Sequence, residues 1–504
     1  MPRWPGALAA LLMAGLCLGT LAPLLGRAGG GGLGPADWAA LRFTLVQAAL
    51  SAGASVVLAV PVARALARRR FPGRSALVTL LGAPFILPVI VAVLGLLAVF
   101  GRGGLLNDGL RALGWPPVSI YGLQGVVLAH VFLNLPLATR LILQGWLDIP
   151  AERFRLAATL NAPVWAVLER PMLRQVVPGA VAAIFALCLT SFSVALILGG
   201  GPAATTVELA IYQAIRFEAD FAGAAQLALL QYALCGGAAL LAVALTRGPV
   251  LGAGLGRAVE RWDAGGLGAR VADALWIGAA ALFLLLPLGL IVLRGIGGLD
   301  DLPGEAWGAT GRSLLVALGA TALSVGLALA LALRGGALAQ VAGALPLAAS
   351  SLVLGTGLLL VLRPFVGLGA VALPVTALAD ALMALPFALR SLAPALAEVE
   401  ARHGRLAESL GIVGVARLGI VVLPLLRPAL GFAGGLAAAL SMGNLGVIAL
   451  FAGQGQGTLP LLMAQLMGAY RMEAAAGVGL VILLLALGLF WAFDRGGRLD
   501  AAAR

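Results

Sequence analysis

Hydrophobic positions follow one another along this chain in long runs, with no sign of the alternation expected of half-buried strands. Each run is long enough to cross about 30 Å of hydrocarbon as a helix, and short arginine-, glycine- and proline-containing segments separate the runs. We predict twelve spans, which begin near Gly6, Trp38, Ala76, Ile120, Val176, Ala222, Ala272, Arg312, Ala339, Gly369, Pro428 and Ala474. The first run resembles a signal peptide, but so many similar runs follow that a retained span is predicted. The pattern predicts an all-α integral membrane protein.

Composition supports this prediction and narrows the chemistry. Hydrophobic residues make up 61% of the 504 residues, and only 11% are charged, against about 25% in soluble domains. All 33 basic residues are arginine, so the chain lacks the lysine that a Walker A phosphate loop requires. Two histidines and three scattered cysteines give no metal-ligand pattern. We therefore predict no cofactor, no metal site and no ATPase activity in this chain.

The arginines indicate the orientation in the membrane. They lie in short loops between apolar runs, a pattern that argues against a nucleic-acid-binding surface and follows the positive-inside rule. With an even number of spans, 24 of the 33 arginines fall on one side, including the loops around Arg69, Arg155, Arg261 and Arg405. Both termini are therefore predicted to be cytoplasmic. The cluster 68–70 is interpreted as an anchor of this topology, with binding of anionic lipid as the alternative.

The chain also repeats itself. A shift of 250 residues aligns Leu128–Arg140 with Leu378–Arg390, and 11 of 33 positions are identical from 128 to 160. Ser191 pairs with Ser441 at the same shift. We predict two fused six-span halves, residues 1–250 and 272–504, joined by a cytoplasmic linker at 251–271. Repeats in the same orientation place a transport pathway between them.

The best repeated segments are two cytoplasmic loops, near residues 148–175 and 391–427. Each contains a short amphipathic segment, Ala151–Leu160 in the first and Arg402–Leu410 in the second. Two symmetric helices suit the docking of two copies of an ATPase, whereas helices that merely lie on the membrane surface would show the same amphipathicity. Gly411 ends the second segment, where a left-handed residue commonly closes a helix. Asn161 is predicted to form the same turn in the first.

These loops carry a family resemblance. The stretch Arg405–Gly411, followed after nine residues by Val421–Pro424, resembles the "EAA" signature of permease subunits in binding-protein-dependent ABC importers. In the first copy Asn161 replaces the glycine, and Pro171 comes three residues early. The coupling residues assigned by this resemblance are Arg155, Ala157, Asn161, Arg405, Ala407, Gly411, Leu423 and Pro424.

A second stretch narrows the family. Gly199–Ile215 resembles the permease of thiamine and thiamine pyrophosphate ABC importers, although ferric-ion permeases carry a related stretch. The resemblance implies a type I ABC importer permease fold that works with a periplasmic thiamine-binding protein and a homodimeric cytoplasmic ATPase. A ferric-ion importer is the first alternative. An ion-coupled secondary carrier is the second, because such carriers also use internal repeats.

Candidate pathway residues gather near the outer face of the membrane in both halves. Polar residues inside spans usually face the bundle interior or a cavity, and for a cationic aromatic substrate carboxylates and tyrosines suit attraction and stacking. The alternative for each is a helix–helix hydrogen bond. The candidates are Ser191, Ser193, Glu208, Tyr212, Gln213, Ser441, Asn444 and Gln465. His130, in an apolar span, is predicted to be a buried, hydrogen-bonded residue.

Overall fold

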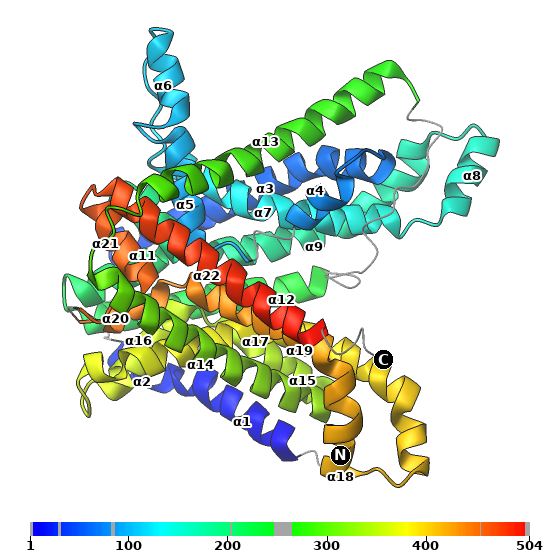
Figure 1. Ribbon diagram of the computed structural model, residues 1–504. Helices are drawn as coiled ribbons and strands as arrows, with labels where there is room; N and C mark the ends of the chain where they lie inside the picture. Colours follow the sequence, from blue (N-terminus) through cyan, green and yellow to red (C-terminus); the bar gives the residue numbers. More distant parts are fainter. Residues whose placement is uncertain are drawn as a thin grey trace.

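The first part of the chain forms a series of helices. The computed structural model describes residues 4–28, 32–81, 86–201, 204–245, 265–453 and 455–498, and within these ranges it contains helices but no strand (Figure 1). The helices before the predicted linker are α1 (Trp4–Gly19), α2 (Leu21–Arg27), α3 (Pro35–Arg68), α4 (Arg74–Leu80), α5 (Val89–Phe100), α6 (Leu105–Ala112), α7 (Leu123–Leu147), α8 (Ala151–Thr159), the π-helical turn η2 (Trp165–Glu169), α9 (Arg170–Leu189), α10 (Phe192–Leu198), α11 (Val207–Arg216) and α12 (Phe221–Leu245).

The second part repeats this series with small changes. Its helices are α13 (Leu267–Gly297), α14 (Glu305–Arg334), α15 (Gly336–Ala348), α16 (Ser351–Leu362), α17 (Leu368–Ser409), α18 (Gly414–Arg417), the π-helical turn η5 (Leu418–Val422), α19 (Leu423–Met442), α20 (Gly446–Phe451), α21 (Leu459–Gly468) and α22 (Met472–Arg498). Helix α13 begins five residues before the predicted start at 272. Residues 251–264 of the predicted linker, Arg261 among them, lie outside the described residues.

The prediction of an all-α membrane protein is confirmed. Eleven helical segments in the described part of the chain are long and apolar enough to span a bilayer, and α15 with α16, bent by 87°, brings the number to twelve. The third run, predicted to begin near Ala76, holds α4 and α5, and its membrane-long stretch begins at Val89. Leu240, Leu293 and Leu315 are among many large apolar side chains exposed on the outside. An apolar surface of this kind fits contact with lipid.

The first helix of each series packs on the other series. Helix α1 lies against α14 and α15, whereas α13 lies against α3 and α5. Small residues allow these crossings, as in many membrane proteins. A Cβ atom added to Gly95 of α5 would lie 2.9 Å from the carbonyl oxygen of Pro287 in α13, so only glycine fits there. The two series are therefore interlocked.

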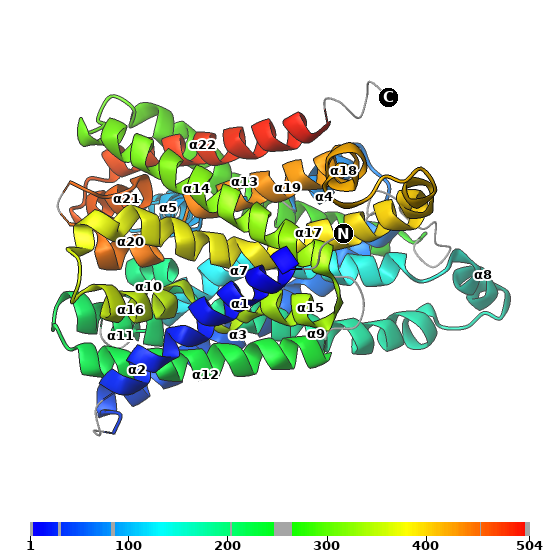
Figure 2. The same cartoon turned by 90° about the horizontal axis from the view of Figure 1, so that it is seen from below.

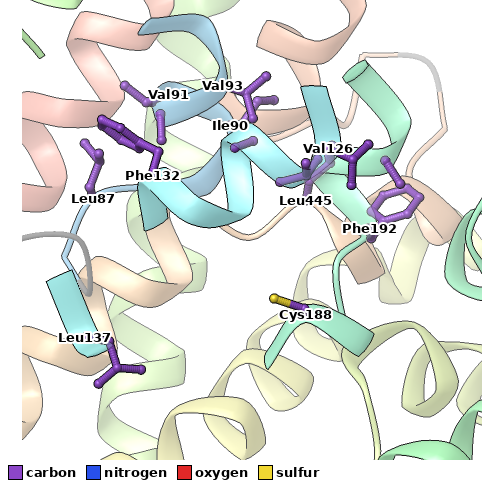
Figure 3. Close-up of a cluster of buried hydrophobic side chains, with 14 of the residues drawn as sticks. Leu87, Ile90, Val91, Val93, Val126, Phe132, Leu137, Cys188, Phe192 and Leu445 are labelled. Carbon is purple, nitrogen blue, oxygen red and sulfur yellow. The ribbon is translucent and has the colours of Figure 1, made fainter. Parts of the chain in front are cut away.

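The core extends across both series. Buried side chains of α5, α7, α9 and α10 form one cluster together with Leu445, which lies just before α20. Figure 3 shows Leu445 beside Val126 of α7, near Ile90 and Phe192. The pathway region is thus held by apolar contacts from both parts of the chain.

The two ends of the molecule differ. Helix α8, helix α18, the start of α1 and the end of α22 lie at one end, and α11, α20 and α21 lie at the other (Figure 2). The two amphipathic segments, the start of α1 and the end of α22 thus share one side, an arrangement that an even number of spans requires. We call the ends the coupling end and the outer end.

Candidate translocation pathway and coupling loops

Short helices α11 and α21 lie at the outer end and begin in the same way. The Val207 amide at the start of α11 donates to the Thr44 hydroxyl of α3 at 2.9 Å, and the Leu459 amide of α21 donates to the Ser313 hydroxyl of α14 at 2.8 Å. The Thr206 hydroxyl also caps α11 by accepting from the Leu209 amide. An N-cap of this kind contributes about 1 kcal/mol. These bonds fix the polar segments against the second span of each series.

In each series the helix of the fifth span, α9 or α19, ends at a short break before the next helix. A polar contact lies at this break in both series. In the first, Nε2 of His130 lies 2.6 Å from the Ser191 hydroxyl, and Nδ1 lies 3.3 Å from that of Ser51. His130 is buried, so its predicted environment is confirmed. In the second, Ser441 donates to Asp380 at 2.6 Å. Asp380 stands 250 residues after His130, as Ser441 stands 250 after Ser191.

Asp380 was absent from the candidates chosen from the sequence. Its carboxylate is buried and accepts from Ser441 and, through the other oxygen, from the Asn444 side-chain amide at 2.6 Å. The repeat held the signal, because the aligned segments place Asp380 opposite His130. Ser441 and Asn444 therefore converge on a residue that sequence reasoning missed.

Glu208 has a different environment. It lies in the first turn of α11, where a carboxylate is favourable to the helix dipole, and it is buried. Gln231 of α12 donates to its Oε1 at 3.4 Å, and the Ser350 hydroxyl lies close to the carboxylate. Among the described residues, none donates a hydrogen bond to the buried oxygens Glu208 Oε2 and Gln231 Oε1.

The remaining pathway candidates lie in several environments. Tyr212 is half-buried, and its ring packs against Phe192 and Phe217 with centroids 5.2 Å and 5.8 Å away. Ser193 and Gln213 are half-buried. Gln465 is exposed, so the structure does not bring it to the contacts formed by Asp380 and Glu208. Its place in the pathway remains a prediction.

At the coupling end, the two predicted turns have the same backbone. Asn161 and Gly411 adopt left-handed conformations with φ of 48° and 69°, as predicted. The Ala162 amide donates to the Ala157 carbonyl at 2.8 Å, and the Ile412 amide to that of Ala407 at 2.9 Å. These are the long hydrogen bonds of a Schellman motif.

The exposure of the side chains repeats as well. Ala157 and Ala407 are buried beneath their turns, and Arg155 and Arg405 are exposed. Each turn carries two exposed leucines, which give it an apolar outer surface. They are Leu156 and Leu160 in the first turn and Leu406 and Leu410 in the second, each 58–68% exposed. The two turns therefore present matching surfaces outward.

The early proline of the first loop has a structural counterpart. Pro171 and Pro424 each occupy the second position of an α-helix, α9 and α19, directly after the π-helical turns η2 and η5. Proline lacks the amide that would bond to the preceding turn, and a π-helical turn absorbs such a defect. The shift of three residues in sequence therefore moves the π turn along its helix, and Leu423 begins α19.

The helix that leads to each turn differs. In the first loop, residues 148–150 separate α7 from α8, whereas α17 runs from Leu368 to Ser409 without a break. The predicted amphipathic segment Arg402–Leu410 is helical through Ser409, but it is not a helix of its own: its residues form the last turns of α17 and the start of the cap. Pro150 occupies the position of Glu400 at the 250-residue shift, and proline at this position favours the interruption.

The supports of the two loops also differ. Buried Glu169 at the end of η2 forms an ion pair with Arg64 at 2.8 Å and accepts from the Trp146 indole at 3.3 Å. At the end of η5 stands Val422. It belongs to an apolar cluster with Leu396, Val399 and Leu426. We call these the polar base of the first loop and the apolar base of the second.

The tip of the second loop has an ionic contact of its own. Arg417, nearly buried, pairs with Glu400 and, at 3.1 Å, with Glu408. Since Glu408 lies three residues before Gly411, this arginine ties the turn to the rest of the loop. At the 250-residue shift Glu400 and Glu408 correspond to Pro150 and Ala158, so the first loop lacks these acidic groups.

The arginine cluster 68–70 has a role beyond topology. Arg68 donates to buried Asp273 of α13 at 2.8 Å, and Arg69 donates to the same carboxylate at 2.6 Å. The interpretation of these two arginines as simple anchors was therefore incomplete, because they fasten the first helix of the second series to the first series.

Comparison with known proteins identifies the family. No family model matches the chain. The chain is 43% identical over 477 residues to the thiamine transport system permease protein of Salmonella typhimurium. The alignment covers 91% of this chain and 89% of the relative. The chain belongs to the thiamine transport system permease family. The permease is also 38% identical over 513 residues to the Brucella abortus protein of that name, covering 97% of this chain and 94% of the relative.

A third relative extends the comparison. The permease is 36% identical over 477 residues to the thiamine transport system permease protein of Haemophilus influenzae, with 90% of this chain and 87% of the relative covered. It is thus a multi-pass inner-membrane protein, and its relatives are named as transport permeases. This agrees with the resemblance seen in Gly199–Ile215.

Proposed function

We propose that the permease moves thiamine or its phosphates from a periplasmic binding protein into the cytoplasm. The observation that carries the proposal is similarity to thiamine permeases across 87% or more of each chain. The geometry supports it: carboxylates and an aromatic cluster around Tyr212 suit a cationic aromatic substrate. Glu208 and Asp380 are the acidic groups. The six pathway candidates besides Glu208 and Tyr212 are part of the same proposal; they are Ser191, Ser193, Gln213, Ser441, Asn444 and Gln465.

We propose that ATP is hydrolysed by two copies of a separate ATPase, docked on the two coupling turns. The support is the pair of matching apolar surfaces, since an ATPase dimer needs two equivalent contacts. Closure of the dimer pushes the two loops together, and the halves open alternately to the two sides. The coupling end is then cytoplasmic, as are both termini.

A reconstituted transport assay tests the function. The permease is placed in liposomes with its ATPase inside and the binding protein outside, and labelled thiamine and ferric ion are offered in parallel. We expect ATP-dependent accumulation of thiamine. Uptake of ferric ion in place of thiamine favours the first alternative, and uptake driven by an ion gradient without ATP favours a secondary carrier.

Two simpler measurements test the partners and the topology. The purified permease alone should hydrolyse no ATP, because its sequence lacks the phosphate-loop lysine; turnover by the chain alone contradicts the assignment of a separate ATPase. A reporter fused after Arg504 should be active only in the cytoplasm, as the arginine distribution predicts. A reporter active in the periplasm would reverse the orientation.

A further inference from the structure

The bend between α15 and α16 lies where the two halves meet. Ser350 at this bend is buried and caps α16 through the Val353 amide, and it lies close to Glu208 of the first half. Next to it, the Ser351 hydroxyl lies against Gly446 of the second half. Two consecutive serines thus contact a polar segment from each half.

The polar segment of the second half leads directly to the second carboxylate. Asn444 accepts from the Gly446 amide at 3.0 Å through its oxygen and donates from its nitrogen to Asp380. A chain of contacts through the α15–α16 bend therefore links the two carboxylates: Ser350 lies near Glu208 where α16 packs against α11, and Ser351 leads through Gly446 and Asn444 to Asp380.

Neither carboxylate has a cationic partner within the described ranges. Ser441 and Asn444 are the hydrogen-bond donors to Asp380; Gln231 donates to Glu208, and the Ser350 hydroxyl lies near the same carboxylate. Acidic side chains in a membrane interior are otherwise paired with one another or with a basic group, and an intramembrane ionisable residue indicates a substrate or ion pathway. Each carboxyl group is thus held by neutral groups alone, and no basic side chain of the described residues would balance its charge when it is ionised.

The site also has unused acceptors. Glu208 Oε2 and Gln231 Oε1 are both shielded from solvent, and no donor of the described residues forms a hydrogen bond with either, although the Ser350 hydroxyl lies nearby. Two oxygens at one place can therefore accept from a group that the described residues do not supply. A positively charged molecule with an amino group supplies both a compensating charge and a donor.

We propose that Glu208 and Asp380, one from each half, form an intramembrane anionic site for an organic cation and make the translocation step selective for its positive charge. The site rests on the proposed function and extends it, since the thiazolium ring of thiamine carries a fixed positive charge and its pyrimidine ring an amino group. The carboxylates attract the ring charge, and Gln231 accepts from the amino group.

The repeat shows why the site forms once. His130 stands at the position of Asp380, and Pro460 follows Thr458 as Glu208 follows Thr206. Each half therefore contributes one carboxylate, at a different position of the repeat. A single site that neither half can complete alone fits the passage of one substrate molecule along the axis between them.

The test separates charge from shape. In the reconstituted complex, the binding protein is supplied saturated either with thiamine or with its uncharged isostere, in which thiophene replaces thiazolium. Saturation removes the preference of the binding protein from the comparison. The measured quantity is the ratio of the two transport rates. If the native complex transports no thiamine, this result contradicts the proposed function itself and not the selectivity for charge, which the ratio measures.

We expect Glu208→Gln and Asp380→Asn each to lower this ratio about tenfold, since close charge pairs in buried sites couple at least this strongly, and Asp380→Glu to restore most of it. Thr376→Val is the matched control. Thr376 is buried on helix α17, as Asp380 is, and its hydroxyl donates to the Ala372 carbonyl of the same helix. This variant should keep the native ratio.

Two results overturn the proposal. An unchanged ratio, with both rates reduced equally, shows that the carboxylates only position the helix breaks. Unchanged rates for both molecules show that they do not meet the substrate. Because Asp380→Asn also changes the acceptor of the Ser441 hydrogen bond at the break, the isosteric Glu208→Gln variant decides the question by itself. The intact complex of this variant is first verified by size-exclusion chromatography.

Discussion

The first and second coupling loops reach the same shape with different supports. Both end in a Schellman turn at a left-handed residue, Asn161 or Gly411. The first loop is interrupted before its short helix and rests on a polar base around Glu169, whereas the second continues an unbroken helix, rests on an apolar base and has an ionic contact at Arg417. The shape of the docking surface is therefore preserved while its mechanical support is free to vary.

The largest effect is expected from Gly411→Val. A β-branched residue at a φ of 69° costs about 1–2 kcal/mol or forces the turn to refold, so most of the thiamine transported per ATP should be lost. Coupled ATPase activity and uptake are measured together in the reconstituted complex. Asn161→Val is the matched variant, because its backbone is the same; equal losses place the effect in the turns, and unequal losses place it in their supports. Normal coupling in Gly411→Val contradicts the turn argument.

A smaller effect is expected from Arg417→Ala. The arginine is nearly buried, but Glu400 and Glu408 are 38% and 66% exposed at the side chain, so solvent screens the pairs and the loss is about 1 kcal/mol or less. Hydrogen exchange should rise in residues 400–417 and stay unchanged in the first loop. Arg402→Ala, which removes an exposed pair with Glu398 on the same helix, should leave exchange at the turn unchanged. Equal changes in both variants would show that the tip is not held by Arg417.

The smallest effect is expected from Asn161→Gly. Asparagine already tolerates the left-handed conformation, and glycine adopts it without a Cβ penalty, so coupled uptake should change by less than about twofold. The measurement is the same transport assay. A large loss would mean that the Asn161 side chain itself contacts the ATPase, and the two loops would then differ in their docking chemistry as well as in their supports.

The sequence predicted features that depend on local chemistry. One apolar run corresponds to one span, so all twelve runs reappear as helices or bent pairs. The left-handed turn at Asn161 was predictable because it depends on one backbone position. The continuity of α17 was not, because it depends on the packing of Leu396 and Val399 against Val422, which the amphipathic pattern of residues 402–410 does not record.

The candidate site was predicted only in part, for the same reason. Ser191 and Ser441 were found through the repeat, but each meets its partner across 61 residues of sequence. Asp380 stands alone in an apolar span and belongs to no local motif. The repeat places it opposite His130, but its bonds to Ser441 and Asn444 depend on packing that the sequence does not show. Glu208 was predicted as a pathway residue because a carboxylate suits a cationic substrate. That one of its oxygens lacks a hydrogen-bond donor among the described residues depends on the packing of α11 against α12, which the sequence does not show.

The first helix of each series packs on the other series, and this arrangement affects which helices would move together. Helix α1 rests on α14 and α15, and α13 is fastened to α3 by Asp273. If the two predicted halves move against each other, we expect α1 to move with the second half, whereas α13 is held by α3 and α5 of the first half and by α22 of its own half. The predicted halves 1–250 and 272–504 are therefore not expected to move as two separate rigid bodies.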